Sequence, residues 1–144
     1  MLSRFSSSRT FIMTSTLLGV VALCGGLAHS LGLVPVESVD AEPRMYLASV
    51  IELLCGILLL TAAFSLRSIR PSAWRNALGA HAGALLLLAV GILLFSTAVR
   101  YAVLSTGFQV MLFLLIALNS AGLWRLRPRN PLRRAQHEMA ARLY

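Results

Sequence analysis

Three side chains able to bind a proton or a hydrogen-bonding solute lie inside long apolar stretches of this 144-residue sequence: His29, Glu52 and Gln109. In a bilayer a carboxylate has no water to bind, and at the centre of a membrane helix it costs about 2.5–3.5 kcal/mol. Desolvation also disfavours its charged form unless a partner holds the charge. Glu52 is therefore expected either to form a proton or cation site, or to be a neutral acid bonded to a neighbouring helix.

The positions of the three residues predict that they form an intramembrane polar cluster. At about 1.5 Å of rise per helical residue, Glu52 lies about 9 Å and His29 about 6 Å from the same membrane boundary. The first two apolar stretches are separated by a short connection, so they are expected to be antiparallel neighbours. An imidazolium–carboxylate pair would offset the burial cost of both groups, and Gln109 could join it from the last stretch. The alternative is that His29 reaches the outer headgroups alone.

The sulfur-containing residues give weaker evidence for a functional site. Cys24 and Cys55 lie at matching depths and, with Met111, are the soft ligands that copper(I) prefers. Such residues more often serve as apolar filler, so we predict no metal site. A haem between His29 and His81 is disfavoured because the two are expected in opposite leaflets, roughly 20 Å apart in a core of about 30 Å. No cofactor is predicted.

Motifs of soluble enzymes are missing from the sequence. It contains no GxSxG, no HExxH, no glycine-rich phosphate loop and no CxxC. Glu52 has no second carboxylate within the apolar stretches. The sequence therefore predicts no enzyme active site.

Four apolar stretches must position these residues, and each is close to the roughly 20 residues that cross a bilayer. The chain is 58% hydrophobic and only 12% charged, against about 25% charged residues in soluble domains. This composition excludes a soluble enzyme and a free nucleic-acid-binding domain. We predict an all-α, polytopic membrane protein in which residues 1–144 form one four-helix transmembrane domain. The predicted spans are 11–33, 46–66, 77–97 and 102–124, followed by a basic tail at 125–144.

The connections between the spans are marked unevenly. Residues 34–45 carry two prolines and three acids, and residues 67–76 carry a proline and three arginines, so both are predicted loops. The third connection has one charge and no proline, and we place its turn near Arg100. In the tail, Asn130 and Pro131 predict the start of a short surface helix.

The distribution of arginine predicts the orientation. All thirteen basic residues are arginine, and eleven of them fall in the amino-terminal segment, the 67–76 loop and the tail. Cytoplasmic segments carry the excess of basic residues, so both termini are expected in the cytoplasm of a bacterial cell, with the chain in its inner membrane. The net charge of +8 then marks orientation and attracts anionic lipid headgroups, not nucleic acid.

The amino terminus admits a second interpretation. A basic start, an apolar run and the small residues of 26–28 also fit a cleaved signal peptide. The apolar run continues to Leu33, beyond the about 7–15 residues of a signal h-region, so we predict a retained helix. A mitochondrial presequence is a third possibility for this Ser- and Arg-rich start.

Small residues predict how the helices pack. Gly79 and Gly83 form a GxxxG pattern, which permits close backbone approach, within this chain or between two copies. Small and polar residues also form one stripe in each of two spans, and we expect these stripes to face each other. The second span contributes Ser49, Glu52, Gly56 and Ala63, and the fourth contributes Ser105, Gln109, Ile116 and Asn119.

Two functions are compatible with this architecture. The first is an accessory or interaction subunit of a larger inner-membrane system, bound to another membrane protein or to a second copy through its small-residue faces. The alternative is a small proton-coupled transporter or carrier that uses the Glu52–His29 pair.

Overall fold

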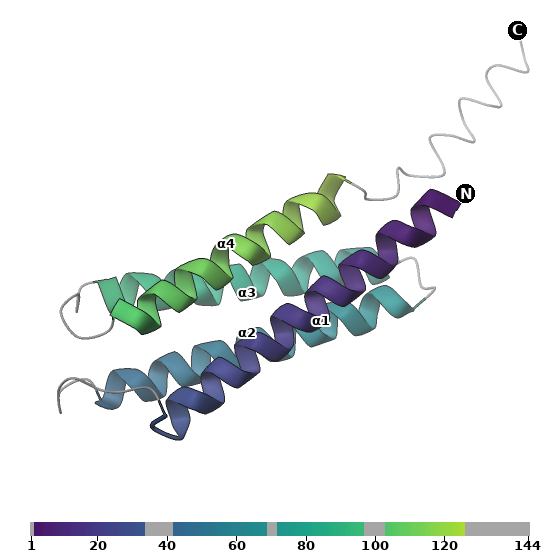
Figure 1. Cartoon of the computed structure of the whole chain (residues 1–144). Helices are drawn as coiled ribbons and strands as arrows, with labels where there is room; N and C mark the ends of the chain where they lie inside the picture. Colours follow the sequence, from purple (N-terminus) through teal and green to yellow (C-terminus); the bar gives the residue numbers. More distant parts are fainter. Residues whose placement is uncertain (1, 34–41, 69–71, 97–102, 126–144) are drawn as a thin grey trace, which may run out of the picture.

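The computed structural model describes residues 2–33, 42–68, 72–96 and 103–125, and in this part of the chain every regular element is an α-helix. Each helix contains a segment long and apolar enough to cross a membrane. The predicted all-α fold with four spanning helices is thereby confirmed, and a four-helix bundle fits it (Figure 1). The turn near Arg100 and the tail helix fall outside the described residues. The helices are α1 Leu2–Ser30, α2 Glu42–Arg67, α3 Ala73–Ser96 and α4 Val103–Arg125.

A glycine cap ends α1 three residues before the predicted boundary at Leu33. Gly32 has a φ of 66°, a conformation that costs glycine little because it lacks a Cβ. The amide of Leu33 donates to Ala28 O at 2.9 Å, and the amide of Gly32 donates to His29 O at 3.3 Å. This pair of bonds is the Schellman motif, which satisfies carbonyls left free at a helix end. The cap places His29 in the last turn of α1.

The helix α2 begins at Glu42, so the prediction of a loop as far as residue 45 was wrong by four residues. Pro43 does not prevent this start, because the first turn of a helix needs no backbone N–H from it. The helix α3 likewise begins at Ala73, before the predicted residue 77, and the amide of Asn76 donates to Ser72 O at 2.9 Å. Both differences arise because a helix can extend beyond its apolar segment.

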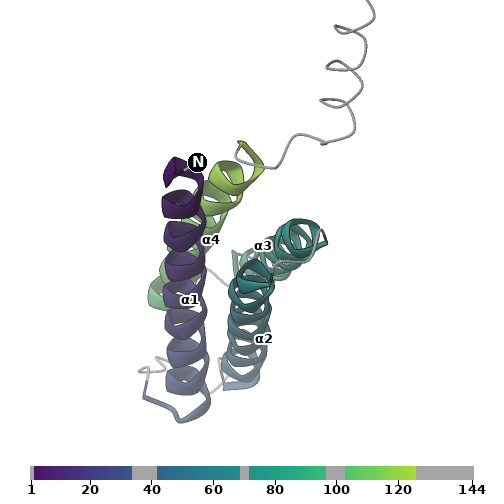
Figure 2. The same cartoon turned by 90° about the vertical axis from the view of Figure 1, so that its right-hand side faces the viewer.

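The four helices alternate in direction along one long axis (Figure 1). The start of α1, the end of α4 and the α2–α3 connection lie at one end, at the right of Figure 1. Arg9, Arg67, Arg75 and Arg125 belong to this end, which we call the arginine end. In Figure 2, α1 and α3 flank α2. The closest packing joins α1 to α2 and α2 to α3, whereas α4 packs on α3 and less on α1.

Close contact between α1 and α2 depends on glycines outside the predicted GxxxG pair. A Cβ on Gly56 would lie 2.5 Å from Leu23 Cγ and 2.9 Å from Gly19 O. Gly83 is less crowded, because its Cβ position meets only the flexible end of one side chain, Leu58 Cδ1 at 3.3 Å, and Gly79 has no heavy atom within 4 Å. The α1–α2 seam is therefore where the absence of side chains lets two backbones approach.

Substitution of Gly56 tests this seam. Gly56→Ala should destabilise the protein by about 1–3 kcal/mol, the usual cost of overpacking, because the new methyl group meets the Gly19 carbonyl. Gly79→Ala is the matched control and should stabilise α3 by up to about 1 kcal/mol through helix propensity. Thermal unfolding in detergent, followed by far-UV circular dichroism, measures both. Equal midpoints for the two variants would contradict the close approach.

Candidate functional site

The structure brings His29, Glu52 and Gln109 together at the end of the bundle opposite the arginine end; we call them the carboxylate cluster. His29 Nδ1 lies 2.7 Å from Glu52 Oε2, and Gln109 Nε2 donates to Glu52 Oε1 at 3.3 Å. Glu52 and Gln109 are fully buried and His29 is 6% exposed. One carboxylate from α2 thus joins side chains of α1 and α4.

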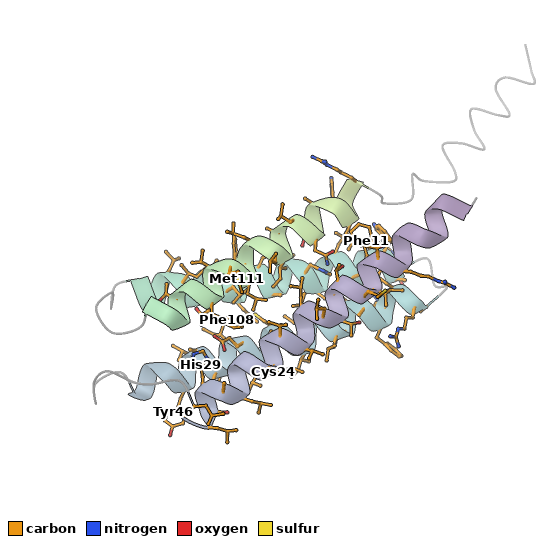
Figure 3. The ribbon with its side chains drawn as sticks, viewed as in Figure 1. Phe11, Cys24, His29, Tyr46, Phe108 and Met111 are labelled. Carbon is orange, nitrogen blue, oxygen red and sulfur yellow. The ribbon has the colours of Figure 1, made fainter. Side chains whose placement is uncertain are left out.

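Local features of α1 and α2 position the carboxylate. Ser49, one turn before Glu52, donates its hydroxyl to Gly26 O at 2.7 Å and so fixes the two helices at this level. A Cβ on Gly25 would lie 3.0 Å from Glu52 Oε2 and 2.6 Å from the ring of Phe108. Glycine at this position lets the carboxylate and the Phe108 ring both lie against α1. Figure 3 labels His29 and Phe108 in the same half of the bundle.

Two polar atoms of the carboxylate cluster are buried and have no hydrogen-bond partner among the described residues. They are His29 Nε2 and Gln109 Oε1. Gln109 Oε1 faces α3, since a Cβ on Gly91 would lie 3.0 Å from it. Buried polar atoms are nearly always paired in folded proteins, so each of these atoms is free to hydrogen-bond a water molecule or a small polar solute. The cluster offers a carboxylate flanked by two such atoms.

A second polar cluster lies nearer the arginine end and was not predicted; we call it the histidine cluster. It comprises Thr14, Ser15, His81 and Asn119. His81 Nε2 lies 3.2 Å from Ser15 Oγ and 3.0 Å from Asn119 Nδ2, which also donates to Ser15 Oγ at 3.1 Å. Thr14 donates to Asn119 Oδ1 at 2.8 Å. The cluster joins α1, α3 and α4, and the expectation that the α2 and α4 stripes face each other was wrong beyond Gln109 and Glu52. Asn119 contacts α1 and α3, and Ser49 and Gly56 of the α2 stripe face α1.

The sequence holds one signal for the histidine cluster. Ser15 follows Arg9 by six residues, His81 follows Arg75 by six, and Asn119 precedes Arg125 by six. Since these arginines mark one end of the bundle, equal offsets place the three side chains at equal depth. Nothing in the sequence shows which face of each helix they occupy, and that information comes only from the packing.

The sulfur-containing residues have different surroundings. Cys24 and Met111 are exposed, whereas Cys55 is buried and its thiol donates to Ala84 O of α3 at 3.4 Å. Figure 3 labels Cys24 on α1 and Met111 on α4. Within the described ranges, no three His, Cys, Asp or Glu residues are grouped so as to hold a metal ion.

Comparison of the chain with models of known protein families, with curated proteins and with solved structures found no match. The class therefore rests on the four long apolar helices alone, which are those of a small multi-pass membrane protein. Within that class, the distinguishing feature of this chain is a pair of polar clusters, one toward each end of the bundle.

Removal of the imidazole tests whether His29 compensates the Glu52 charge. His29→Leu should cost about 3–5 kcal/mol, the usual effect of leaving one member of a buried ion pair alone. In a Glu52→Gln background the same substitution should cost much less. Chemical unfolding of the four variants in mild detergent measures the coupling, and an equal loss in both backgrounds would rule out a charged pair.

Proposed function

We propose that this small membrane protein is a proton-coupled carrier whose working centre is the carboxylate cluster. The observation that carries the proposal is the fully buried Glu52, whose Oε2 lies 2.7 Å from His29 Nδ1 on α1 and whose Oε1 accepts a hydrogen bond from Gln109 on α4. Ionisable groups inside membrane helices are costly, and in membrane proteins they commonly mark proton or substrate pathways.

Protonation of Glu52 would couple proton binding to a change in helix packing. The ionised carboxylate attracts the imidazole of His29 and the amide of Gln109 together, and so holds α1 and α4 toward α2. A proton on Glu52 removes the negative charge and weakens both contacts, since hydrogen bonds to a charged group are roughly twice as strong as neutral ones. Proton uptake would thus loosen this end of the bundle, and proton release would close it.

The unpartnered atoms indicate the class of solute. When the pair is ionised, His29 Nε2 is a hydrogen-bond donor, and Gln109 Oε1 is an acceptor. A small, uncharged polar solute that both donates and accepts hydrogen bonds would match them. An anion would be repelled by Glu52, and a cation would meet His29.

The proposed orientation places the carboxylate cluster near the outer face of the membrane. Its support is the position of Arg9, Arg67, Arg75 and Arg125 at one end of the bundle, because basic residues are retained in the cytoplasm. Both termini would then be cytoplasmic, in a bacterial inner membrane, with the basic tail against anionic lipid headgroups.

Glu52→Gln tests the carrier. The substitution keeps the shape and hydrogen-bonding capacity of the side chain but removes its proton exchange. In proteoliposomes with an imposed pH gradient and a trapped pH-sensitive dye, the wild type should dissipate the gradient and Glu52→Gln should reduce that rate at least tenfold. Glu138→Gln, outside the four spans, is the matched control and should behave as wild type. Equal proton flux in wild type, Glu52→Gln and empty liposomes would refute the proposal.

A second candidate function is that of an accessory or interaction subunit. It is favoured by the exposed face of α3 around Gly79, where the helix backbone is open and nothing lies within 4 Å of the Cβ position. Ala82, Leu86 and Leu93 continue this exposed face toward the other end. A neighbouring membrane helix, from another protein or from a second copy, could approach closely there.

Bulky substitutions distinguish a helix interface at Gly79 from a surface that only contacts lipid. Gly79→Ile should abolish association with a membrane partner or a second copy, because it blocks close helix approach. Gly107→Ile on α4 is the matched control, since Gly107 also has open space around its Cβ position. Affinity purification in mild detergent, with the oligomeric state measured by light scattering, reports both kinds of partner. Identical behaviour of the two variants would contradict an interface at Gly79.

A further inference from the structure

The histidine cluster is arranged so that it can accept a proton without losing a hydrogen bond. We propose that it is a second proton-binding site, with His81 Nε2 as the atom that takes the proton. This inference goes beyond the proposed carrier mechanism, which uses only the carboxylate cluster, and it does not depend on that mechanism.

In the neutral state the backbone fixes the tautomer of His81. Its Nδ1 atom lies 2.8 Å from Ala77 O, which can only accept, so Nδ1 carries the hydrogen. Nε2 then has the free lone pair. It accepts from Asn119 Nδ2 at 3.0 Å or from Ser15 Oγ at 3.2 Å. The basic nitrogen thus faces α1 and α4 and not its own helix.

In the protonated state Nε2 becomes a donor, and the amide of Asn119 can turn to meet it. A half-turn of this amide exchanges Nδ2 and Oδ1, so that Oδ1 accepts from His81 Nε2 and from Ser15 Oγ. Nδ2 then donates to Thr14 Oγ1, and the Thr14 hydroxyl turns its hydrogen to Thr10 O, already 3.0 Å away. Every contact keeps its distance and only the directions of donation reverse. Hydroxyl and amide groups permit this because each both donates and accepts.

The described residues around His81 include no acidic side chain, so a charged ring would be stabilised only by the neutral oxygens of Asn119 and Ser15. On α2, residues 59–63 at this level contain no titratable group, and the nearest on that helix are Cys55 and Arg67. The charged groups that the helices place at this end are Arg4 and Arg9 of α1, Arg67 of α2, Arg75 of α3 and Arg125 of α4. Arg9, Arg67, Arg75 and Arg125 are exposed. Their positive charges disfavour an additional positive charge on His81. Among the described residues the acids lie on α2, at Glu42 and Glu52, toward the opposite end.

Proton binding to His81 would change the hydrogen bonds that hold α4 to α1 and α3. Asn119 is the residue of α4 that contacts both α1 and α3 in this cluster, and its amide must turn when His81 is charged. The proton comes from water at the arginine end, and its uptake adds one positive charge with no bond broken elsewhere. The protein would therefore have one proton site toward each end of the bundle.

The direct test is the titration of His81 in the full chain in lipid nanodiscs. Nitrogen NMR of labelled histidine distinguishes the neutral Nδ1–H tautomer from the doubly protonated ring, and His29→Gln and His137→Gln assign the signals. We expect His81 to pass reversibly from the neutral tautomer to the charged ring as the pH falls, with helix content unchanged. The same titration should persist in Glu52→Gln, so that failure of the carrier and failure of this site are separable.

Substitutions of Asn119 test the mechanism of proton binding. Asn119→Leu removes the acceptor and should lower the proton affinity of His81 about tenfold, the effect of losing one hydrogen bond to a charged group. Asn119→Asp supplies a carboxylate and should raise the affinity by at least as much, which keeps the test decisive if the leucine variant does not fold. Ser120→Ala, whose hydroxyl bonds only to Ile116 O of its own helix, is the matched control.

Three results would overturn the proposal. The first is that His81 remains the neutral Nδ1–H tautomer at every pH at which the helices persist. Alternatively, its protonation would coincide with loss of helix content, which means that the charged ring is not accepted by the folded protein. Finally, Asn119→Asp would titrate like Ser120→Ala, which means that Asn119 does not face the proton.

Discussion

A carboxylate or amide side chain that its own helix backbone does not satisfy must find a partner on another helix inside an apolar bundle, and this constraint decides how the fourth helix is held. The backbones of α1 and α2 approach closely at glycines, and α2 also packs closely on α3. The contacts of α4 with the other helices include two polar ones, Gln109 with Glu52 and Asn119 with Ser15 and His81. Without water, such bonds have no competitor within the membrane, so they select one register of α4 among those that apolar packing alone would permit.

The two clusters satisfy this constraint in different ways. In the histidine cluster each polar side-chain atom has a partner, and hydroxyl and amide groups let donors and acceptors exchange roles. In the carboxylate cluster, His29 Nε2 and Gln109 Oε1 have no partner among the described residues. The first arrangement is suited to holding helices in either protonation state, and the second is suited to binding something from outside. The second arrangement contains the buried carboxylate of Glu52, on which the proposed proton coupling rests.

The sequence was sufficient to predict the four helices, because about twenty apolar residues in succession have few other stable forms in a bilayer. It was also sufficient to place His29, Glu52 and Gln109 at similar depth, because the rise per residue is constant. It could not predict the α1–α2 seam: a GxxxG pattern at Gly79 and Gly83 has the same spacing whether it meets a helix or faces outward. Nor could it assign Asn119 to α1 and α3, since helix rotation depends on the packing of all four helices. Helix ends were misplaced where capping by Gly32 or continuation through Pro43 outweighed hydropathy.

The space between the clusters limits how they can communicate. Gln109 and Asn119 are ten residues apart on α4, which is about 15 Å along the helix. Between their levels the core is formed by fully buried apolar side chains, among them Leu59, Leu88, Leu112 and Ile116. The buried polar side chain of this layer is Cys55, a weak donor and acceptor whose thiol donates to Ala84 O at 3.4 Å. It gives a proton a poor route between the two clusters. Mechanical coupling between the ends is available through α1 and α4, because both helices contribute polar residues to both clusters. The described residues form no continuous polar path between the two clusters, whereas the proposed carrier requires only that the bundle loosen at one end while it is held at the other.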